Sequence, residues 1–346
     1  MRSRRFTQRT ATARGRRAKR RATRSVKTER PGLPVSIVGT GFAAPGKVQT
    51  AEDLAPQIGR SADWIRSRTG VVERRVSDLP MEEMAALAAR DALGDGPPPD
   101  LILNASLTPV QLIPDSSVFI QEALGYSGIP SFSVHATCLS FLVGLHTAVH
   151  YAAAGTWQRI LLVSAEKGTG FRDFGEPESA ALIGDGAAAA VIERGQGRWL
   201  DFAFESWPEG AVYAQIPGAG TRLPPHEATV EDYRFRMQGT RIYRLGRAKM
   251  AEMMFSVIQR NGLTLADIDL VVPHQMSGPG LQAFRRVGVS DEQLVDIVST
   301  YGNCVAASLP MALATAERDG RLRRGAKVLF CGLGAGLSLA AGLMEW

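Results

Sequence analysis

The sequence predicts an α/β protein in which helices cover both faces of β-sheets. Short apolar segments of strand length alternate along the chain with longer amphipathic segments of the helix type. The apolar segments are continuous rather than alternating, which is typical of strands buried on both faces. Hydrophobic residues make up 45% of the chain and charged residues 21%, which suits a globular protein with a sizeable core. We therefore expect a layered α/β architecture.

Six segments have the composition and length of buried strands. In chain order they are Val35–Val38, Leu101–Asn104, Ser131–Val134, Ile160–Ser164, Leu270–Val272 and Val328–Cys331. The apolar stretch at 328–343 is longer but contains four glycines, so we expect two strands joined by a glycine turn rather than a membrane span. No linker rich in proline and serine interrupts the chain, so its parts should pack together.

Helix signals lie between these strands. A helix follows Thr50, where Asp53 completes an acidic variant of the capping box. A second helix at 80–93 has two glutamates in its first turn. A third ends at Gly155, a residue suited to the position after a helix. This third helix is expected at 139–154, and a fourth helix is expected at 240–259.

The charge of the chain is divided unevenly. The whole sequence has 40 Lys and Arg against 34 Asp and Glu, a net charge of +6. Residues 1–30 hold 13 basic residues and one acidic residue, a net charge of +12, so the remaining 316 residues hold 27 and 33, a net charge of −6. We expect residues 1–33 to be a disordered basic leader. Three interpretations stay open: a solvated leader without a role, a start-site artefact with translation beginning at Val26, or a targeting or polyanion-binding arm.

The cysteine content and the leader indicate the cellular compartment of the protein. Only three cysteines occur, each in an apolar stretch, which argues against a disulfide framework and favours a reducing compartment. The basic leader is not followed by an apolar segment of signal-peptide type. We therefore expect a cytoplasmic protein without a membrane segment.

Three polar residues far apart in the sequence are candidates for catalysis. Cys138 opens the predicted helix 139–154, where unpaired backbone N–H groups and the helix dipole favour the thiolate. His274 ends an apolar strand, and Asn303 precedes a predicted helix. Each has an ordinary structural alternative: a buried cysteine, a core histidine and an N-cap asparagine. Together they form a nucleophile with two polar side chains suited to stabilising a carbonyl oxygen.

These residues belong to a set of seven short motifs. The motifs are Val38-Gly39-Thr40-Gly41, Asp63-Trp64-Ile65-Arg66-Ser67-Arg68-Thr69-Gly70, Ala136-Thr137-Cys138, Gly184-Asp185-Gly186-Ala187, Pro273-His274-Gln275, Tyr301-Gly302-Asn303 and Gly334-Ala335-Gly336-Leu337-Ser338. Across residues 34–346 their order and spacing resemble those of the ketoacyl-acyl-carrier-protein synthase III (KAS III) family of the thiolase superfamily. Each motif alone is weak, but the ordered set is specific.

The resemblance implies a thiolase-like fold and a decarboxylating condensation. The fold has two pseudo-symmetric halves, 34–205 and 206–346, in α-β-α-β-α layers. Cys138 would take an acyl group from a thioester, and the backbone N–H groups of Cys138 and Ala335 would form the oxyanion hole. His274 and Asn303 would stabilise the enolate formed when a malonyl thioester loses carbon dioxide. The enolate would attack the acyl group to give a 3-ketoacyl product of a fatty-acid, biotin-precursor or polyketide-type pathway.

The resemblance also implies the ligands and the assembly. The substrates are acyl-CoA and a malonyl thioester, with an acyl carrier protein as a partner, and no further cofactor is needed. Trp64 and Arg68 match the positions that grip the nucleotide end of coenzyme A. Three more substrate-binding candidates are Thr69, Met276 and Ser277. The family forms homodimers.

Three departures from the family pattern point to a specialised relative. The usual His-Gln-Ala-Asn followed by a basic residue is here His274-Gln275-Met276-Ser277-Gly278-Pro279. The segment 173–179 lacks an arginine that typical members use for coenzyme A. Ile113 stands where the family often has an aromatic residue that caps the acyl pocket across the dimer. Because Ile113 is smaller, we expect a longer or branched starter group.

Other functions fit the residues less well. The alternative enzyme is an acyltransferase that moves the acyl group from Cys138 to an alcohol or amine without decarboxylation. Nucleic-acid binding is not expected, because the body of the chain is acidic. No metal site is expected either, because His146 and His150 have zinc-pair spacing without a third ligand nearby in sequence. Either a local basic patch around Arg241, Arg244 and Arg247 docks an acidic carrier protein, or coenzyme A thioesters are the donors.

Overall fold

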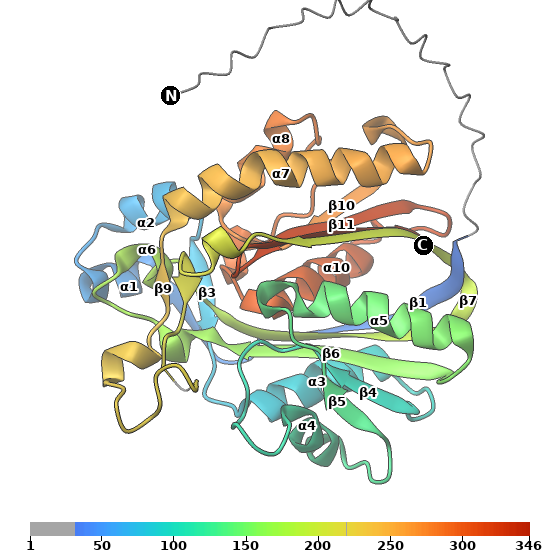
Figure 1. Cartoon of the computed structure of the whole chain (residues 1–346), viewed down its shortest axis with the longest axis horizontal. Helices are drawn as coiled ribbons and strands as arrows, with labels where there is room; N and C mark the ends of the chain where they lie inside the picture. The colour runs from blue at the N-terminus through green and yellow to red at the C-terminus, as the bar shows by residue number, and fades with distance from the viewer. Residues whose placement is uncertain (1–31, 219) are drawn as a thin grey trace, which may run out of the picture. The chain divides into compact units, whose positions relative to one another are not determined.

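The computed structural model describes residues 32–218 and 220–346 of the chain (Figure 1). Residues 1–31 of the predicted basic leader lie outside this part. The first strand, β1 (Leu33–Ala43), begins at the last residue assigned to the leader. The described residues belong to one compact unit. The division into halves at 205/206 stays a prediction, and it falls at the end of a strand that both parts of the sheet share.

The first half contributes five strands. They are β1, β4 (Leu101–Asn104), β5 (Ser131–Ser133), β6 (Arg159–Lys167) and the first part of β7 (Asp185–Ser206). β4 pairs in parallel with both β5 and β6, and β7 pairs antiparallel with β6 and β1. β5 is therefore an edge strand of the sheet.

The second half continues from the other end of β7. There β7 pairs antiparallel with β12 (Ser338–Glu345), which pairs antiparallel with β11 (Lys327–Gly334). β11 pairs in parallel with β10 (Leu270–Pro273). The expected pair of strands joined by a glycine turn at 328–343 is thereby confirmed. The sequence did not predict β7, the long strand that pairs with β12 at one end and with β1 and β6 at the other.

Helices form three layers around these strands. Figure 1 shows α7 (Gly239–Arg260) and α8 (Gly278–Arg286) on the outer side of β10 and β11, and α3 (Met81–Leu93) and α4 (Ser116–Leu124) beyond β4, β5 and β6. Between the strands of the two halves lie α5 (Ser140–Ala154) and α10 (Ser308–Arg318). The predicted α/β class and its α-β-α-β-α order are confirmed.

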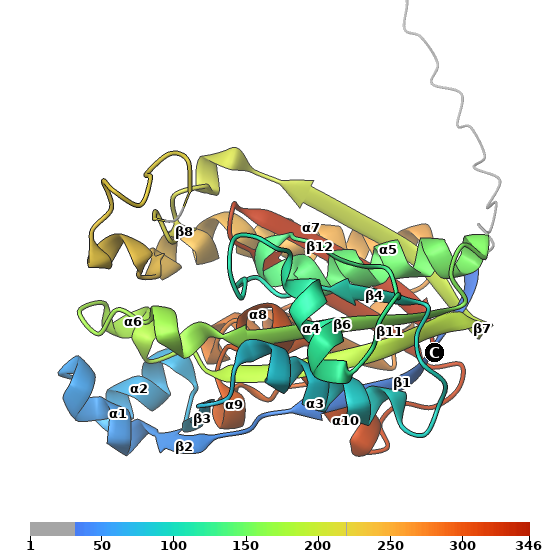
Figure 2. The ribbon, with the colours of Figure 1, turned by 90° about the horizontal axis from the view of Figure 1, so that it is seen from below.

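Smaller elements surround one end of these layers, and Figure 2 shows them from a second direction. They are β2 (Lys47–Thr50), α1 (Ala51–Ile58), α2 (Ala62–Thr69), β3 (Glu73–Val76), α6 (Pro177–Ala180), β8 (Ala214–Gln215), β9 (Arg236–Met237) and α9 (Val298–Tyr301). The predicted capping box starts α1, because the backbone N–H of Asp53 donates to Thr50 Oγ1 at 3.1 Å and that of Thr50 to Asp53 Oδ2 at 2.9 Å.

Helix α5 is the centre of the molecule. It ends as predicted at Gly155, which adopts the left-handed conformation with φ 74°. The segment Thr137–Ala154 passes a length and composition test for a membrane-crossing helix, but half of it is buried inside the protein, as in the core helix of a layered fold. His146 of this helix stacks on Phe202 with ring centroids 4.0 Å apart and accepts a hydrogen bond from Trp199 Nε1. It therefore packs the helix against β7.

Candidate active site

The three candidate catalytic residues come together in the structure. Cys138, His274 and Asn303 line one cavity of about 140 Å³, together with Ala335 and Met276. Cys138 precedes α5, whereas His274 follows β10 and Asn303 follows α9. The cavity thus brings distant parts of the sequence into one site.

Cys138 lies on a tight turn between β5 and α5. A short 3-10 helix, Thr137–Leu139, carries it, and Thr137 has the left-handed φ of 54°, which is uncommon for a β-branched residue. Ser140 holds the turn, because its Oγ accepts from the backbone N–H of Ala136 at 3.0 Å and donates to the carbonyl of Thr137 at 2.7 Å. Backbone strain that the surroundings maintain in this way is common at functional sites.

The acidity of the Cys138 thiol differs from the sequence expectation. The position before α5 predicted a favoured thiolate, but burial raises the pKa of Cys138 to about 11. The negative charge of Glu166 adds to this rise, while the backbone amides of Ala335 and Cys138 oppose it. Desolvation therefore outweighs the amides, and the resting nucleophile is a thiol at neutral pH.

Two backbone N–H groups act on the sulfur, those of Ala335 and of Cys138 itself. They are the groups that the family resemblance assigned to an oxyanion hole. The turn carrying Ala335 approaches Cys138 closely, since Thr137 Oγ1 donates to the carbonyl of Ala335 at 3.2 Å. This approach requires glycine at 334, where an added Cβ would lie 2.7 Å from Thr137 Oγ1 and 3.2 Å from Leu139 Cγ.

His274 is held at the carboxyl end of β10. It is 2% exposed, and its backbone N–H donates to the carbonyl of Cys331 at 2.8 Å. Its neighbour Gln275 fixes the strand end, because its side-chain amide donates to the carbonyls of Pro273 and Val295. Burial lowers the pKa of His274 to about 4, so its imidazole is neutral at physiological pH. Nδ1 of this ring has no hydrogen-bond partner among the described residues.

Asn303 holds a turn before a helix and lines the cavity. Its Oδ1 accepts from the backbone N–H of Val305 at 2.8 Å, at the start of the helical segment that continues into α10. The N-cap position itself is Cys304, so Asn303 forms a local turn just before the helix and is not its N-cap residue. This bond fixes the rotamer, and Nδ2 donates only a 3.3 Å hydrogen bond to the carbonyl of Met276. An amide N–H is thus available on the cavity side.

Glu166 is a neighbouring residue that sequence reasoning missed. It is fully buried and accepts hydrogen bonds from the backbone N–H groups of Leu107 and Thr108 and from Thr108 Oγ1, at 2.5, 3.2 and 2.8 Å. Burial raises its pKa to about 7 against these hydrogen bonds. Since Leu107 and Thr108 line the cavity, Glu166 fixes one of its walls. The available signal was a carboxylate inside an apolar strand, β6.

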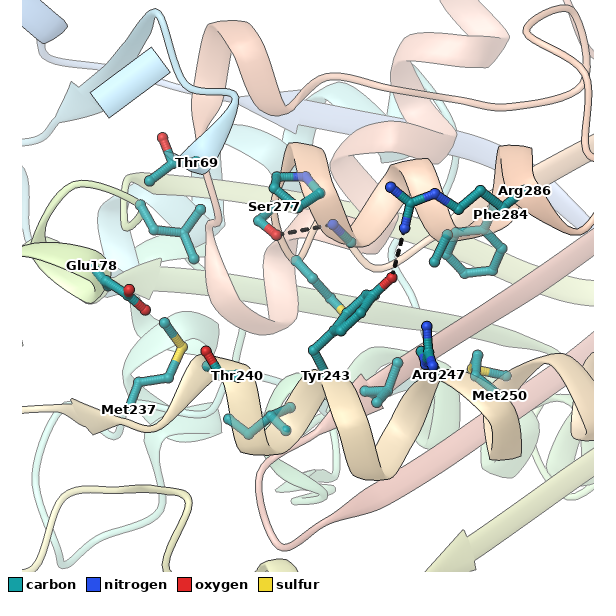
Figure 3. Close-up of a pocket in the computed structure, with 18 of the residues that line it drawn as sticks. Thr69, Glu178, Met237, Thr240, Tyr243, Arg247, Met250, Ser277, Phe284 and Arg286 are labelled. Carbon is teal, nitrogen blue, oxygen red and sulfur yellow. Dashed lines mark hydrogen bonds between the residues drawn. The ribbon is translucent and has the colours of Figure 1, made fainter. Parts of the chain in front are cut away.

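A second, larger cavity adjoins the first. Its volume is about 380 Å³, and Figure 3 shows its lining. The two cavities share five apolar residues: Leu182, Met237, Ile242, Met276 and Leu333. Together with Met250, Met254 and Phe284 they make the interior of the larger cavity apolar. We call the smaller one the inner cavity and the larger one the outer cavity.

The substrate-binding candidates divide between these places. Arg68, Thr69, Met276 and Ser277 line the outer cavity. Ser277 also caps α8, because its Oγ accepts from the backbone N–H of Gly280 at 3.1 Å. Met276 lines both cavities and so lies at their junction.

Trp64 and Ile113 lie elsewhere. In the structure of residues 32–218 and 220–346, neither lines the inner or the outer cavity. Trp64 lines a neighbouring depression, where the guanidinium of Arg60 lies 5.5 Å from its ring centroid. Ile113 is 83% exposed. The roles expected for Trp64 and Ile113 stay predictions.

Arg68 is paired with a carboxylate. Its Nε and Nη2 both donate to Oε1 of Glu178, at 2.9 and 2.5 Å. Glu178 belongs to the segment 173–179, which lacks the expected arginine. The departure was visible in the sequence, but the place of Glu178 in the site was not. In the described part of the chain, no cluster of three or more metal-ligating side chains is found.

The geometry agrees with what comparison with known proteins shows. Two family models match the chain: "3-Oxoacyl-[acyl-carrier-protein (ACP)] synthase III" at residues 132–208 and the C-terminal model of the same enzyme at residues 258–346. The beta-ketoacyl-[acyl-carrier-protein] synthase III of Solibacter usitatus is 31% identical over 325 residues, 90% of this chain and 98% of the relative. That of Symbiobacterium thermophilum is 34% identical over 326 residues, with the same coverage.

Solved structures show the same likeness. The 3-oxoacyl-[acyl-carrier-protein] synthase III of Aquifex aeolicus has a TM-score of 0.83 and 28% identity, covering 90% of this chain and all of that one. The corresponding enzyme of Thermus thermophilus has a TM-score of 0.81 and 31% identity, covering 90% of this chain and 98% of that one. The chain therefore belongs to the beta-ketoacyl-[acyl-carrier-protein] synthase III family and is a condensing enzyme that transfers acyl groups.

Proposed function

We propose that Cys138 carries the acyl group and that His274 and Asn303 activate a malonyl thioester for decarboxylative condensation. The observation that supports this most strongly is the convergence of all three side chains, with the amides of Cys138 and Ala335, on the inner cavity. A nucleophile, two groups for a carbonyl oxygen and two amides for an oxyanion are the components that acyl transfer requires.

The first half-reaction loads the enzyme. Sγ of Cys138 attacks the carbonyl carbon of an acyl thioester, and the oxyanion receives the N–H groups of Cys138 and Ala335. The bond from the carbonyl carbon to the donor sulfur then breaks, and the departing thiolate takes up the proton that Cys138 loses. Because the pKa of Cys138 is raised, this proton leaves during the reaction. Neutral His274 can accept it transiently.

The second half-reaction forms the carbon–carbon bond. Malonyl thioester loses carbon dioxide, and its carbonyl oxygen becomes an enolate oxygen that His274 and Asn303 Nδ2 stabilise by hydrogen bonds. Its terminal carbon attacks the acyl group, the bond to Cys138 Sγ breaks, and one proton from solvent restores the thiol. A neutral imidazole suits this role, because it donates through one ring nitrogen without needing a charge in the buried site.

The donors, the carrier protein and the assembly of the enzyme are the remaining parts of the proposal. We assign acyl-CoA as a donor and an acidic carrier protein as a second donor and acceptor, in the cytoplasm and without a further cofactor. Arg241, Arg244 and Arg247 are all exposed on α7, which adjoins the outer cavity, and form a basic surface for such a carrier. We also assign a homodimer through the edge strand β5.

The test separates the two half-reactions. His274→Ala should still form acyl-Cys138, seen by intact-protein mass spectrometry, but release carbon dioxide from malonyl thioester at least about a hundredfold more slowly. Cys138→Ala should lose loading with its circular dichroism unchanged. Normal transfer to an alcohol or amine without carbon dioxide release would instead show the non-decarboxylating acyltransferase.

A further inference from the structure

We propose that Tyr243, Arg247 and Arg286 form an anion subsite that receives the phosphate of the donor's pantetheine-type arm. The inference rests on the proposed function, because it assumes that a thioester donor enters through the outer cavity. It places the phosphate on the α7–α8 side of that cavity, away from Arg68 and Trp64 on α2.

The distribution of charge in the outer cavity supports this side. Among the described residues that line it are three cations, Arg68, Arg247 and Arg286, and one carboxylate, Glu178. Glu178 is paired with Arg68 through two hydrogen bonds. Within residues 32–218 and 220–346, neither Arg247 nor Arg286 forms an ion pair. The uncompensated positive charge of the cavity therefore lies on α7 and α8.

The geometry brings these two arginines to one aromatic ring. Nη1 of Arg286 donates to the hydroxyl of Tyr243 at 3.0 Å, and the guanidinium of Arg247 lies 5.7 Å from the centroid of the same ring. Figure 3 shows Tyr243 between the two, with Arg286 reaching down from α8 and Arg247 rising from α7. Both arginines are exposed, whereas Met254 and Phe284 of the same cavity are buried. The subsite is thus at the rim, above an apolar interior.

This arrangement suits a phosphate attached to an uncharged arm. Two guanidinium groups present several N–H donors to phosphate oxygens, and the Tyr243 hydroxyl can donate a further hydrogen bond. The apolar interior, rich in methionine, accommodates the arm without competing charges.

The α2 side is less suited to the same group. Glu178 occupies Arg68, and the depression that Trp64 lines contains a second carboxylate, Glu176. Both repel a phosphate. Arg60 already covers the ring of Trp64 at 5.5 Å.

The experiment compares donors that differ by one phosphate. Loading of Cys138 is measured with acyl-pantetheine and with acyl-4′-phosphopantetheine, for the native protein and for the double variant Arg247→Ala/Arg286→Ala. We expect the double variant to lose about tenfold or more in kcat/KM with the phosphorylated donor and less than about twofold with acyl-pantetheine. Arg68→Ala should change kcat/KM by the same factor with both donors, because the Arg68 guanidinium is paired with Glu178.

A matched control is available on the same helix. Arg285 lies beside Arg286 but pairs with Asp291 and Asp296, and it does not line the outer cavity of the described structure. Arg285→Ala should leave the ratio between the two donors unchanged. Equal losses with both donors in the double variant, or a larger phosphate-dependent loss in Arg68→Ala, would overturn the assignment.

Two further measurements identify the donor that supplies the phosphate and distinguish a failure of the anion subsite from a failure of the proposed acyl-transfer function. Acyl-CoA and an acyl carrier protein share the pantetheine phosphate, so both should show at least the loss that acyl-4′-phosphopantetheine shows in the double variant, and the carrier protein should lose more because Arg247 also belongs to its docking surface. A loss confined to one of them would place the effect on the nucleotide or on the carrier surface and contradict the subsite. If no donor loads native Cys138, the proposed function fails. Calorimetric binding of coenzyme A to Cys138→Ala, with and without the two arginines, then tests the subsite alone.

Discussion

The reactivity of Cys138 toward an alkylating reagent should reveal a strongly suppressed thiolate. Burial raises the pKa of its thiol from 9.0 to about 11. Two units correspond to about 2.7 kcal/mol against the charged form. At pH 8 about one thiol in a thousand would be ionised, against about one in ten for a cysteine at its ordinary value.

The assay measures carboxamidomethylation of Cys138 by iodoacetamide between pH 7 and 10, followed by peptide mass spectrometry. We expect the logarithm of the rate to rise by about one per pH unit over the whole range, because only the thiolate reacts. Cys304 and Cys331, both buried, serve as unreactive internal references while the fold stays intact. A rate that levels off below pH 9 would refute the reasoning. It would show that the helix terminus and the two amides outweigh desolvation.

Three more changes test neighbouring features. The pKa of Glu166 in the folded state, about 7, lies above its usual 4.5, so the stabilisation that Glu166 gives relative to Glu166→Gln is complete below pH 4.5 and is lost as pH rises through 7. Denaturant unfolding of the two proteins should therefore show a difference in the free energy of unfolding that changes with pH by up to about 3 kcal/mol. Parallel curves of unfolding free energy against pH would contradict this prediction. Gly334→Ala should slow acylation at least about tenfold because its Cβ meets Thr137, whereas Gly170→Ala, which meets nothing within 4 Å, should not. Met276→Ala should widen the junction of the cavities and raise kcat/KM for the bulkiest acyl donors several-fold, while an unchanged chain-length profile would exclude Met276 as the constriction.

The layered architecture was predictable because its signals are local. Apolar strands, capping residues and terminal glycines each act over a few residues, and the capping box at Thr50 and the end of α5 at Gly155 appear where expected. The strand β7 was missed because it begins with an alanine run at 187–190, which has low strand propensity. Its pairing with β1 and β6 decides its conformation, and that pairing is long-range.

On the neighbouring strand β1, small side chains have a packing reason. Helix α3 lies so close to β1 that a Cβ on Gly41 would be 1.9 Å from the carbonyl oxygen of Ala88. The requirement for glycine at position 41 is set by the distance between helix and sheet and not by local propensity.

The site was predictable in its residue types but not in its electrostatics. The order and spacing of the motifs identified Cys138, His274 and Asn303, and the structure places them on one cavity. The pKa of Cys138 could not be predicted, because desolvation and Glu166 depend on the tertiary fold. Likewise, the pairing of Arg68 with Glu178 joins residues that are far apart in the sequence.

The central claim is that Cys138 carries the acyl group, and intact-protein mass spectrometry tests it most directly. The protein is exposed to acyl thioesters of increasing chain length, and the modified residue is located by peptide mapping. We expect a mass increase of one acyl group on Cys138, absent from Cys138→Ala and reversed when malonyl thioester is added. Acylation of another residue, or condensation that persists in Cys138→Ala, would contradict the account.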